Sequence, residues 1–455
     1  MADLTVIGGG LAGSEAAWQA AESGLKVALY EMRPLKMTGA HVTDRLGELV
    51  CSNSLGSNLS DRASGMLKEE LRLLKSLLLR CAESSALPAG GALAVDRHSF
   101  ADAVTAHLQG HPNITILRSE MTHIPSTPTI IASGPLTSPA LTGAIQAFSG
   151  VDRLFFYDAI APIIQAESID MDIAFRASRF GLGEQEDGDY INCPFDINQY
   201  TSFVEELKNA ARIKLREFEL DIQQGVRAGI HRFFEGCLPV EVIAERGDRA
   251  LAFGPMRPIG LRNPHTGHGA HAIVQLRQDN LAGSLYNMVG FQTNLTFAEQ
   301  NRVFRMIPGL EKAEFSRYGQ MHRNTFIASP LLIWPTLQSR KRKDLFFAGQ
   351  ITGVEGYMGN IATGLLAGTN AARFLQGKPL ATMPQSTMLG SLCTYITSAS
   401  LKDFQPMKSN YGILPPLSER PKGRKERNFL YLERGVAELK AYCSEMEIPL
   451  NENQE

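Results

Sequence analysis

The sequence has almost no excess charge, no long apolar run and no paired cysteines. Its 455 residues include 45 Lys+Arg and 47 Asp+Glu, a formal net charge of −2, so any surface for nucleic acid has to be a local patch. No segment approaches the roughly 18 consecutive apolar residues of a membrane span. A strand-like run follows Met1 so closely that we expect no signal peptide. The six cysteines include no CxxC pair, which argues against a zinc ribbon or a disulfide framework. These absences favour a cytoplasmic protein.

Histidines recur at intervals of three in one segment, but the pattern does not predict a metal site. His265, His268 and His271 lie in a glycine-containing stretch that favours a loop. No cysteine or carboxylate completes a familiar ligand spacing around them. We therefore expect polar loop histidines and no bound metal.

The start of the chain carries a dinucleotide-binding pattern. Residues 4–7 are β-prone and lead into Gly8, Gly10 and Gly13, which fit the GxGxxG spacing. In that motif the first glycine permits a tight turn and the second lets a pyrophosphate approach the backbone. The third lets the helix and the strand pack closely.

The segments after this turn have the order that the motif needs. A helix is predicted over 11–23, rich in alanine, and a second strand over 25–30. Glu31 follows that strand, where a carboxylate can accept hydrogen bonds from ribose hydroxyls. A glycine-rich turn that binds nothing is the alternative interpretation.

Two later segments resemble the downstream signatures of two-dinucleotide-fold flavoproteins. One is the β-run with a small-residue turn at 129–135, and the other is the buried-strand run at 345–350, followed by a predicted helix over 361–374. In such flavoproteins the last strand places a glycine and a polar side chain against the flavin, and the next helix N-terminus faces its pyrophosphate. A further β–α unit of the same sheet is the alternative. The predicted cofactor-binding residues are Gly8, Gly9, Gly10, Leu11, Ala12, Gly13, Glu31, Gly134, Gly349 and Gln350.

The predicted fold class is α/β, with a discontinuous FAD-binding Rossmann-like domain and a smaller inserted α+β domain. We assign 1–190 and 310–455 to the first domain and 191–309 to the second. The inserted part is expected to hold a helical run over 199–218 and β-prone pieces at 240–244, 271–276 and 285–292, and a closing helix is expected over 428–444. No second GxGxxG occurs, so NAD(P)H would have to bind without a Rossmann domain of its own.

Two cysteines lie in settings that suit chemistry. Cys51 lies in a polar loop soon after the predicted ribose-binding strand, and Cys237 lies between a glycine and a Leu-Pro turn flanked by carboxylates. Either thiol could act as a nucleophile if a base or a cation lowers its pKa. Inert packing is the alternative for both. The basic runs 340–343 and 420–427 are interpreted as solvated faces or as contacts to phosphate.

Many separate segments together resemble one family. They lie at 7–13, 48–55, 155–162, 175–179, 234–241, 253–261, 317–326 and 347–359. The chain is similar, from about residue 3 to about residue 440, to the folate- and FAD-dependent tRNA (uracil-5-)-methyltransferases. The related FAD-dependent wobble-uridine carboxymethylaminomethyl enzymes are similar only in the first and last glycine motifs.

The resemblance implies an activity and its cofactors. It implies C5-methylation of the T-loop uridine (position 54) of tRNA, with methylenetetrahydrofolate as carbon donor, FAD as cofactor and NAD(P)H as reductant. Cys237 matches the family thiol implicated in attack on uracil, and Cys51 matches the other family thiol, near the flavin. An FAD-dependent oxidoreductase acting on a small molecule and a non-catalytic RNA-binding protein remain the alternatives.

Overall fold

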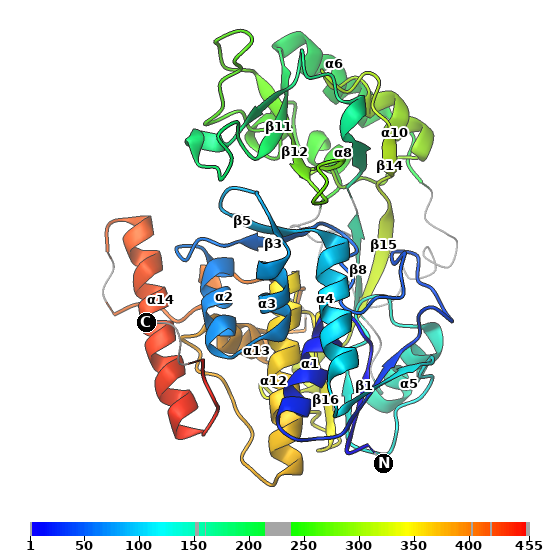
Figure 1. Ribbon diagram of the computed structural model, residues 1–455, viewed down its shortest axis with the longest axis vertical. Coiled ribbons are helices and arrows are strands. Elements are labelled where there is room, and N and C mark those ends of the chain that lie inside the picture. Colours follow the sequence, from blue (N-terminus) through cyan, green and yellow to red (C-terminus); the bar gives the residue numbers. More distant parts are fainter. Residues whose placement is uncertain are drawn as a thin grey trace.

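The structure is a computed structural model that describes residues 2–150, 154–159, 161–213, 238–401, 404–418 and 421–451. Figure 1 shows two lobes stacked along the long axis, and both ends of the chain lie in the lower lobe. Each lobe has its own hydrophobic core. The chain therefore crosses from the lower lobe to the upper lobe and returns.

The lower lobe is built on a five-stranded sheet with the order β16-β7-β1-β2-β6. All four neighbouring pairs are parallel, so the chain has to cross over between paired strands and cannot join them by a tight hairpin. The strands are β1 (Leu4–Ile7), β2 (Val27–Glu31), β6 (Ile114–Arg118), β7 (Thr129–Ile131) and β16 (Leu345–Phe347). The predicted α/β class with a parallel nucleotide-binding sheet is confirmed.

The lower lobe also contains helices. They are α1 (Leu11–Glu22), α2 (Ala63–Leu73), α3 (Leu77–Ser84), α4 (Arg97–Gly110), α5 (Pro139–Ser149), α11 (Ser329–Leu332), α12 (Tyr357–Leu375), α13 (Met388–Ser398) and α14 (Arg424–Glu445). A Cβ at Gly364 of α12 would lie 2.3 Å from the carbonyl oxygen of Ala12 in α1. Glycine is needed there because the two backbones nearly touch. The first turn of α1 therefore packs directly on the middle of α12.

A small antiparallel sheet and a strand pair link the lobes. The sheet holds β3 (Ser54–Ser57), β4 (Ala86–Leu87) and β5 (Ala92–Val95), and the pair holds β8 (Leu154–Ala159) and β15 (Met321–Phe326). In Figure 1 the strands β8 and β15 rise from the lower lobe toward the upper one.

The upper lobe is an antiparallel sheet with the order β10-β11-β12-β13-β9-β14. Its strands are β9 (Ile163–Gln165), β10 (Phe175–Ala177), β11 (Tyr190–Phe195), β12 (Ala272–Gln278), β13 (Leu285–Met288) and β14 (Phe315–Arg317). Its helices are α6 (Ile197–Asn209), α8 (Val240–Glu245), α9 (Ala250–Phe253) and α10 (Phe297–Phe304). Strands β9, β10 and β14 come from the segments that flank 191–309. The domain boundaries at 191 and 309 stay a prediction.

Two sequence expectations for the upper lobe were wrong. The β-prone piece 240–244 is the helix α8, whose residues Val240 and Ala244 lie one turn apart and are both buried in the core of the lobe. This apolar contact outweighs the strand preference of its β-branched residues. The helix expected over 199–218 ends at Asn209, because Ala210 adopts an extended conformation, and the predicted part at 214–218 lies outside the described residues.

Candidate active site

The glycines of the β1–α1 turn have separate tasks. Gly8 has φ +106, and a Cβ at Gly13 would lie 1.7 Å from the carbonyl oxygen of Gly8. Gly13 therefore allows α1 to pack on the turn. A Cβ at Gly10 would meet no protein atom within 4 Å, so the space beside Gly10 is left for a ligand. The first backbone N–H groups of α1 have no intrahelical partner and favour an anion at this end.

A buried charge network lies at the end of β2. The Glu31 carboxylate accepts hydrogen bonds from the backbone N–H of Gly9 and from the backbone and Nε of Arg33, each at 2.9 Å. Arg33 is 1% exposed and also donates to Glu48, at 2.8 Å. Burial disfavours the charge of Glu31, but these bonds and the Arg33 guanidinium outweigh it and lower the pKa of Glu31. The carboxylate is therefore ionised where the motif places a ribose.

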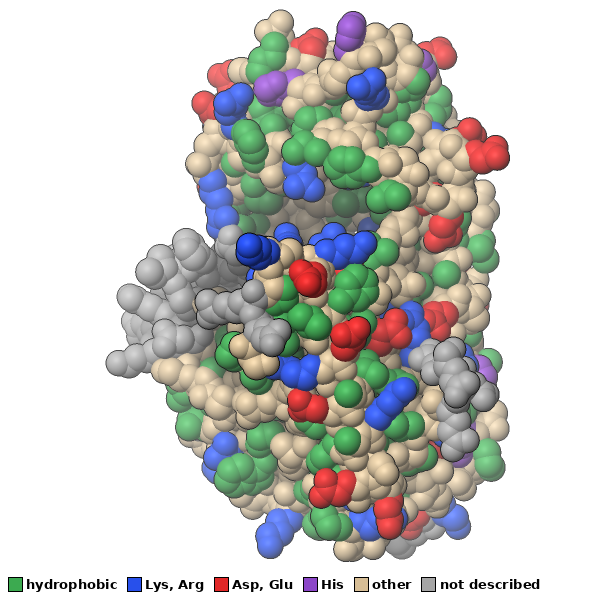
Figure 2. Space-filling view, turned by 90° about the vertical axis from the view of Figure 1, so that its left-hand side faces the viewer, with side chains coloured by type: hydrophobic (Ala, Val, Ile, Leu, Met, Phe, Trp, Pro, Cys, Tyr) green, Lys and Arg blue, Asp and Glu red, His purple; other side chains and the backbone are tan. Residues whose placement is uncertain are grey.

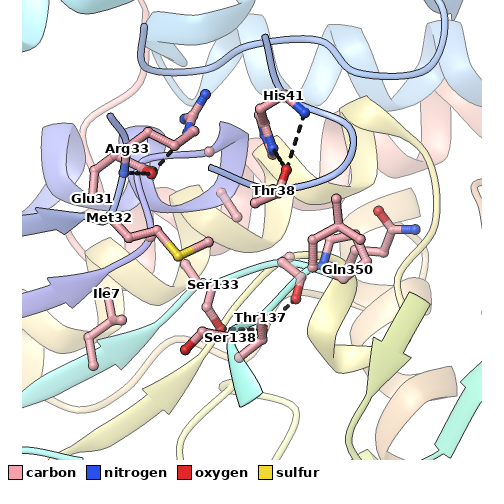
Figure 3. Close-up of a pocket in the computed structure, with 18 of the residues that line it drawn as sticks. Ile7, Glu31, Met32, Arg33, Thr38, His41, Ser133, Thr137, Ser138 and Gln350 are labelled. Carbon is pink, nitrogen blue, oxygen red and sulfur yellow. Dashed lines mark hydrogen bonds and ion pairs between the residues drawn. The ribbon is translucent and has the colours of Figure 1, made fainter. Parts of the chain in front are cut away.

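These residues surround one cavity of about 990 Å³. The predicted residues that line it are Gly8, Gly10, Leu11, Ala12, Glu31, Gly134, Gly349 and Gln350. Gly9 and Gly13 do not line the cavity. The Gly9 N–H donates a hydrogen bond to Glu31, and Gly13 packs on Gly8. Figure 3 shows Glu31 and Arg33 on one side of the cavity and Ser133 and Gln350 on another.

His41 and Asn360 also line this cavity. His41 shares a hydrogen bond of 2.6 Å with Thr38, as drawn in Figure 3. Burial, followed by the charge of Arg33, lowers the pKa of His41 to about 4, so the imidazole is neutral near pH 7. The Oδ1 atom of Asn360, in the first turn of α12, is buried and has no hydrogen-bond partner among the residues that the structure describes. A ligand that donates a hydrogen bond there would remove the cost of that unpaired acceptor.

A second cavity of about 850 Å³ shares a wall with the first. Six residues line both of them: Val50, Pro135, Leu136, Gln350, Tyr357 and Asn360. Cys51 and Ser52 line only the second cavity, together with Gln292, which follows β13 of the upper lobe. The Cys51 side of this second cavity therefore lies where the two lobes meet.

The loop that carries Cys51 is held by its backbone from the lower lobe. The Tyr357 hydroxyl oxygen accepts hydrogen bonds from the N–H groups of Cys51, at 2.8 Å, and Ser52, at 3.2 Å. Arg97, at the start of α4, donates to the carbonyl oxygens of Leu49 and Cys51, at 2.9 and 3.1 Å. These contacts fix the peptide units on both sides of the thiol.

The upper lobe holds the same loop by its side chains. Arg277 of β12 donates from Nη2 to the Ser52 hydroxyl, at 2.6 Å, and from Nε to the Asn53 amide oxygen, at 2.9 Å. Two residues further on, Asp279 forms an ion pair with Arg97 at 3.0 Å. The position of Cys51 therefore depends on how the two lobes are docked.

The surroundings of Cys51 are cationic. Arg97, Arg277 and Arg317 each interact attractively with the charge of a Cys51 thiolate. Neighbouring cations of this kind favour the thiolate, which is the nucleophilic form. Burial, followed by the charge of Cys51, raises the pKa of Tyr357, so this phenol keeps its proton.

The other described cysteines are in the opposite situation. Cys81, Cys193, Cys393 and Cys443 are buried, whereas Cys51 is half-buried. Burial raises the pKa of Cys81 and of Cys443 to about 11 and that of Cys393 to about 12. Cys237, the other predicted nucleophile, lies outside the described residues.

No group of three or more His, Cys, Asp or Glu side chains within the described ranges could hold a metal ion, and no helix there is long and apolar enough to cross a membrane. In the basic run 340–343, Arg340 donates to Ile333 O and Lys341 to Ser149 O. These bonds hold neighbouring segments of the lobe together, which weakens the interpretation of this run as a contact to phosphate.

Sequence reasoning missed several residues of the site. Arg33 follows Glu31 by two positions, and Tyr357 follows the last glycine turn, so both could have been found by their place beside the motifs. Arg97 and Arg277 carry no such signal, because only the folded chain brings them to the Cys51 loop.

Comparisons with known proteins identify relatives of this chain. Residues 3–379 match the family model described as glucose inhibited division protein A. The chain is 53% identical over 443 residues, 97% of this chain and 99% of the relative, to a protein of Shouchella clausii named methylenetetrahydrofolate--tRNA-(uracil-5-)-methyltransferase TrmFO. It is 52% identical to the protein of the same name from Anoxybacillus flavithermus, over 98% of this chain and all of the relative.

Solved structures show the same fold. Aquifex aeolicus GidA, in its form I crystal, matches with a TM-score of 0.69 at 17% identity, over 100% of this chain and 77% of that one. The form II crystal gives a TM-score of 0.68. At this level of identity the match supports the two-lobed flavoprotein fold.

Proposed function

The chain belongs to the glucose inhibited division protein A family and to the methylenetetrahydrofolate--tRNA-(uracil-5-)-methyltransferases, and on this premise we propose that it makes a C5-methylated uridine in tRNA. The proposed target is the T-loop uridine at position 54. The proposed carbon donor is methylenetetrahydrofolate, FAD is the cofactor and NAD(P)H the reductant. The proposed site of action is the cytoplasm.

The observation that carries the proposal is the shared wall of the two cavities. The glycine turn of β1–α1 lines one cavity and Cys51 lines the other, and Gln350, Tyr357 and Asn360 border both. A nucleotide cofactor in the first cavity and a reactive thiol in the second are thereby adjacent. A flavin-dependent transfer of a one-carbon unit needs this adjacency.

The residues of the first cavity fit FAD. Gly10 leaves room for a pyrophosphate, Glu31 offers a charged carboxylate for ribose, and Asn360 offers an unpaired acceptor. When bound, the flavin would supply the two electrons that convert a carbon at the formaldehyde level into a methyl group, with NAD(P)H restoring it.

The chain's own residues would activate the uracil. Uracil C5 becomes nucleophilic when a thiolate adds at C6, and we assign this attack to Cys237. Cys51 would act on the one-carbon side, where Arg97, Arg277 and Arg317 favour its thiolate. C5 would then bond to the methylene carbon, and loss of the C5 proton with departure of tetrahydrofolate would leave a methylene group on C5. Addition of a hydride equivalent to this methylene would complete the methyl group, expel the C6 thiolate and restore the C5–C6 double bond. The target base has to leave its stack to reach either thiol, at a cost of a few kcal/mol.

The test is methyl transfer to an unmodified tRNA transcript with methylenetetrahydrofolate and NAD(P)H. We expect tritium release from uridine C5 with wild-type protein, and none from a transcript in which the target uridine is replaced by cytidine. Cys51→Ala and Cys237→Ala should abolish the release, whereas Cys443→Ala, which removes a buried thiol, should keep it. Flavin-loaded protein that releases no tritium would refute the proposal. RNA-independent turnover of a small molecule would instead support the oxidoreductase alternative.

A further inference from the structure

An exposed aromatic ring of the upper lobe is held in a disfavoured backbone conformation. Phe180 lies in the short helix η2 (Arg179–Gly181) with φ 59 and ψ 20, in the left-handed region. This conformation is unusual for a bulky residue, and such outliers concentrate at functional sites. Phe180 is nevertheless 69% exposed, so burial of the ring does not account for the strain.

The neighbouring loop fixes the position of this ring. The Phe180 N–H donates to the carbonyl oxygen of Gly260 at 2.8 Å. A Cβ at Gly260 would lie 2.9 Å from the Phe180 ring, so the ring rests against the backbone at that glycine. Ile259, 55% exposed, extends the apolar surface beside it. The ring is thus presented to solvent on a rigid support.

Two arginines lie near the ring. Arg179 is oriented by hydrogen bonds from Nε to Gln275, at 2.9 Å, and from Nη1 to the carbonyl oxygen of Ile259, at 2.6 Å. Burial, followed by the charge of the exposed Arg257, lowers the pKa of Arg179. Across the described ranges, neither guanidinium forms an ion pair with a carboxylate. Two like charges that lie near each other favour an anionic ligand.

This surface lies on the same side of the β12 sheet as the Cys51 loop. Gln275, which orients Arg179, precedes Arg277 by two residues on β12, and side chains two apart on a strand share one face. Arg277 in turn donates to Ser52, next to Cys51. Figure 2 looks at the left-hand side of Figure 1 and shows a hollow between the lobes with Lys and Arg side chains along it.

We propose that the surface formed by Arg179, Phe180, Arg257 and Ile259 binds a single-stranded part of the RNA substrate. A base stacks on the Phe180 ring, and the adjoining phosphates contact the two guanidinium groups. Unstacked bases on aromatic side chains are the usual way in which proteins bind RNA loops. The unneutralised arginine pair favours a polyanion over the apolar face of a protein. This inference rests on the proposed function and identifies where the tRNA docks.

The test is the equilibrium binding of an unmodified tRNA transcript to the full-length, FAD-loaded protein, followed by fluorescence anisotropy. Phe180→Ala should raise Kd roughly tenfold, the size of a lost base–aromatic stack, and Phe180→Trp should restore it. Arg257→Ala should raise Kd and reduce the slope of log Kd against log salt by about one. Flavin reduction by NAD(P)H without RNA should be unchanged in all three variants.

Two substitutions serve as matched controls. Trp334→Ala removes another exposed aromatic ring with an arginine above it, in the lower lobe, where Arg340 lies 3.9 Å from the ring centroid. Arg302→Ala removes an upper-lobe arginine that already has Glu206 and Glu299 as partners. Both should bind tRNA within twofold of wild type.

Several outcomes would overturn the inference. If wild type binds and methylates tRNA but Phe180→Ala binds within twofold of it, this surface is not the docking site, and the proposed function stands. If wild type neither binds nor methylates tRNA, the proposed function fails first. A change in sedimentation of Phe180→Ala would make the surface a contact between copies of the chain. Phe180→Gly relieves the left-handed strain, so it provides a folded variant with the same expected loss of binding.

Discussion

The two lobes present their functional groups in different ways. The lower lobe brings backbone close to its cavity at a few positions, because glycines open the turn at Gly8–Gly13 and the turn at Gly349. The upper lobe contributes side chains: Arg277 contacts the Cys51 loop, and Phe180 is exposed at the surface. The lower lobe therefore depends on the absence of side chains at a few positions, and the upper lobe on their presence.

This difference decides how each lobe responds to substitution. A glycine that contacts backbone cannot accept even a methyl group without moving a main-chain segment. A surface arginine or phenylalanine can be removed while the fold is kept, because little is packed on it. The first class of substitution should affect stability and cofactor binding together, and the second class, at exposed residues such as Phe180 and Arg257, should affect only the binding of partners.

The largest effect is expected for Gly13→Ala. Its Cβ would lie 1.7 Å from the carbonyl oxygen of Gly8, so α1 or the turn has to move. We expect loss of bound FAD and destabilisation by about 3 kcal/mol or more, measured by flavin absorbance and urea unfolding. Gly143→Ala is the control, because a Cβ there meets nothing within 4 Å and should stabilise helix α5 by roughly 0.5–1 kcal/mol. Equal FAD content in Gly13→Ala and wild type would contradict the packing role.

The next effect is a pH dependence that comes from a buried carboxylate of the lower lobe. Glu70 accepts hydrogen bonds from the N–H groups of Met388 and Leu389 at the start of α13. Burial outweighs these bonds and raises the pKa of Glu70 from 4.5 to about 7. Between these two values the unfolded carboxylate is ionised while the folded one holds its proton. The folded chain then binds more protons, so its stability falls as the pH rises.

The glutamine of Glu70→Gln cannot titrate. The free energy of unfolding of this variant should therefore fall less than that of wild type between pH 4.5 and about 7, by up to about 3 kcal/mol. Urea unfolding at several pH values measures it. Glu241 in the upper lobe is also buried, bonds Thr293 and Asn294, and has a pKa raised by burial, so Glu241→Gln should flatten the curve in the same direction. A Glu70→Gln curve parallel to that of wild type would show that Glu70 stays ionised.

Gly10→Ala is expected to weaken FAD binding without lowering the stability of the apoprotein. A Cβ at Gly10 would meet no protein atom within 4 Å, so the apoprotein should unfold at the same urea concentration as wild type. A pyrophosphate beside the turn would meet this methyl group, and we expect a loss of about 1–3 kcal/mol in FAD binding. Titration of apoprotein with FAD measures it. Unchanged affinity would place the pyrophosphate elsewhere.

The lower lobe was largely predictable from sequence because its signals are local. A strand, three spaced glycines, a helix and Glu31 follow one another within the first part of the chain, and β1, α1 and β2 form there with small shifts at their ends. The predicted cofactor residues also come together, since parallel strands of one sheet end at the same edge. Such positions follow from topology once the strand order is known.

The upper lobe was less predictable because its sheet depends on distant pairings. Strand β9 pairs with β13 and β14, which lie more than a hundred residues further along the chain. Residues 240–244 have strand-like composition, yet the core contact of Val240 makes them helical. The side chains that matter at the lobe junction, such as Arg277, have no spacing rule that a sequence pattern could reveal.

The smallest effect tests the junction of the lobes through Arg277→Lys. Lysine keeps the charge, but its compact ammonium group cannot reproduce the two bonds from Nε and Nη2 to Asn53 and Ser52. We expect a loss of about 1 kcal/mol of stability, unchanged FAD content, and slower methyl transfer because the Cys51 loop is less well fixed. The rate of Cys51 alkylation by iodoacetamide, followed by mass spectrometry, should change as well, whereas Arg302→Lys, at a surface ion pair of the same lobe, should leave it unaltered. If Cys51 of Arg277→Lys is alkylated at the wild-type rate and the variant methylates tRNA like wild type, the upper lobe does not determine the position of the thiol. The Tyr357 and Arg97 contacts of the lower lobe then suffice to hold the Cys51 loop.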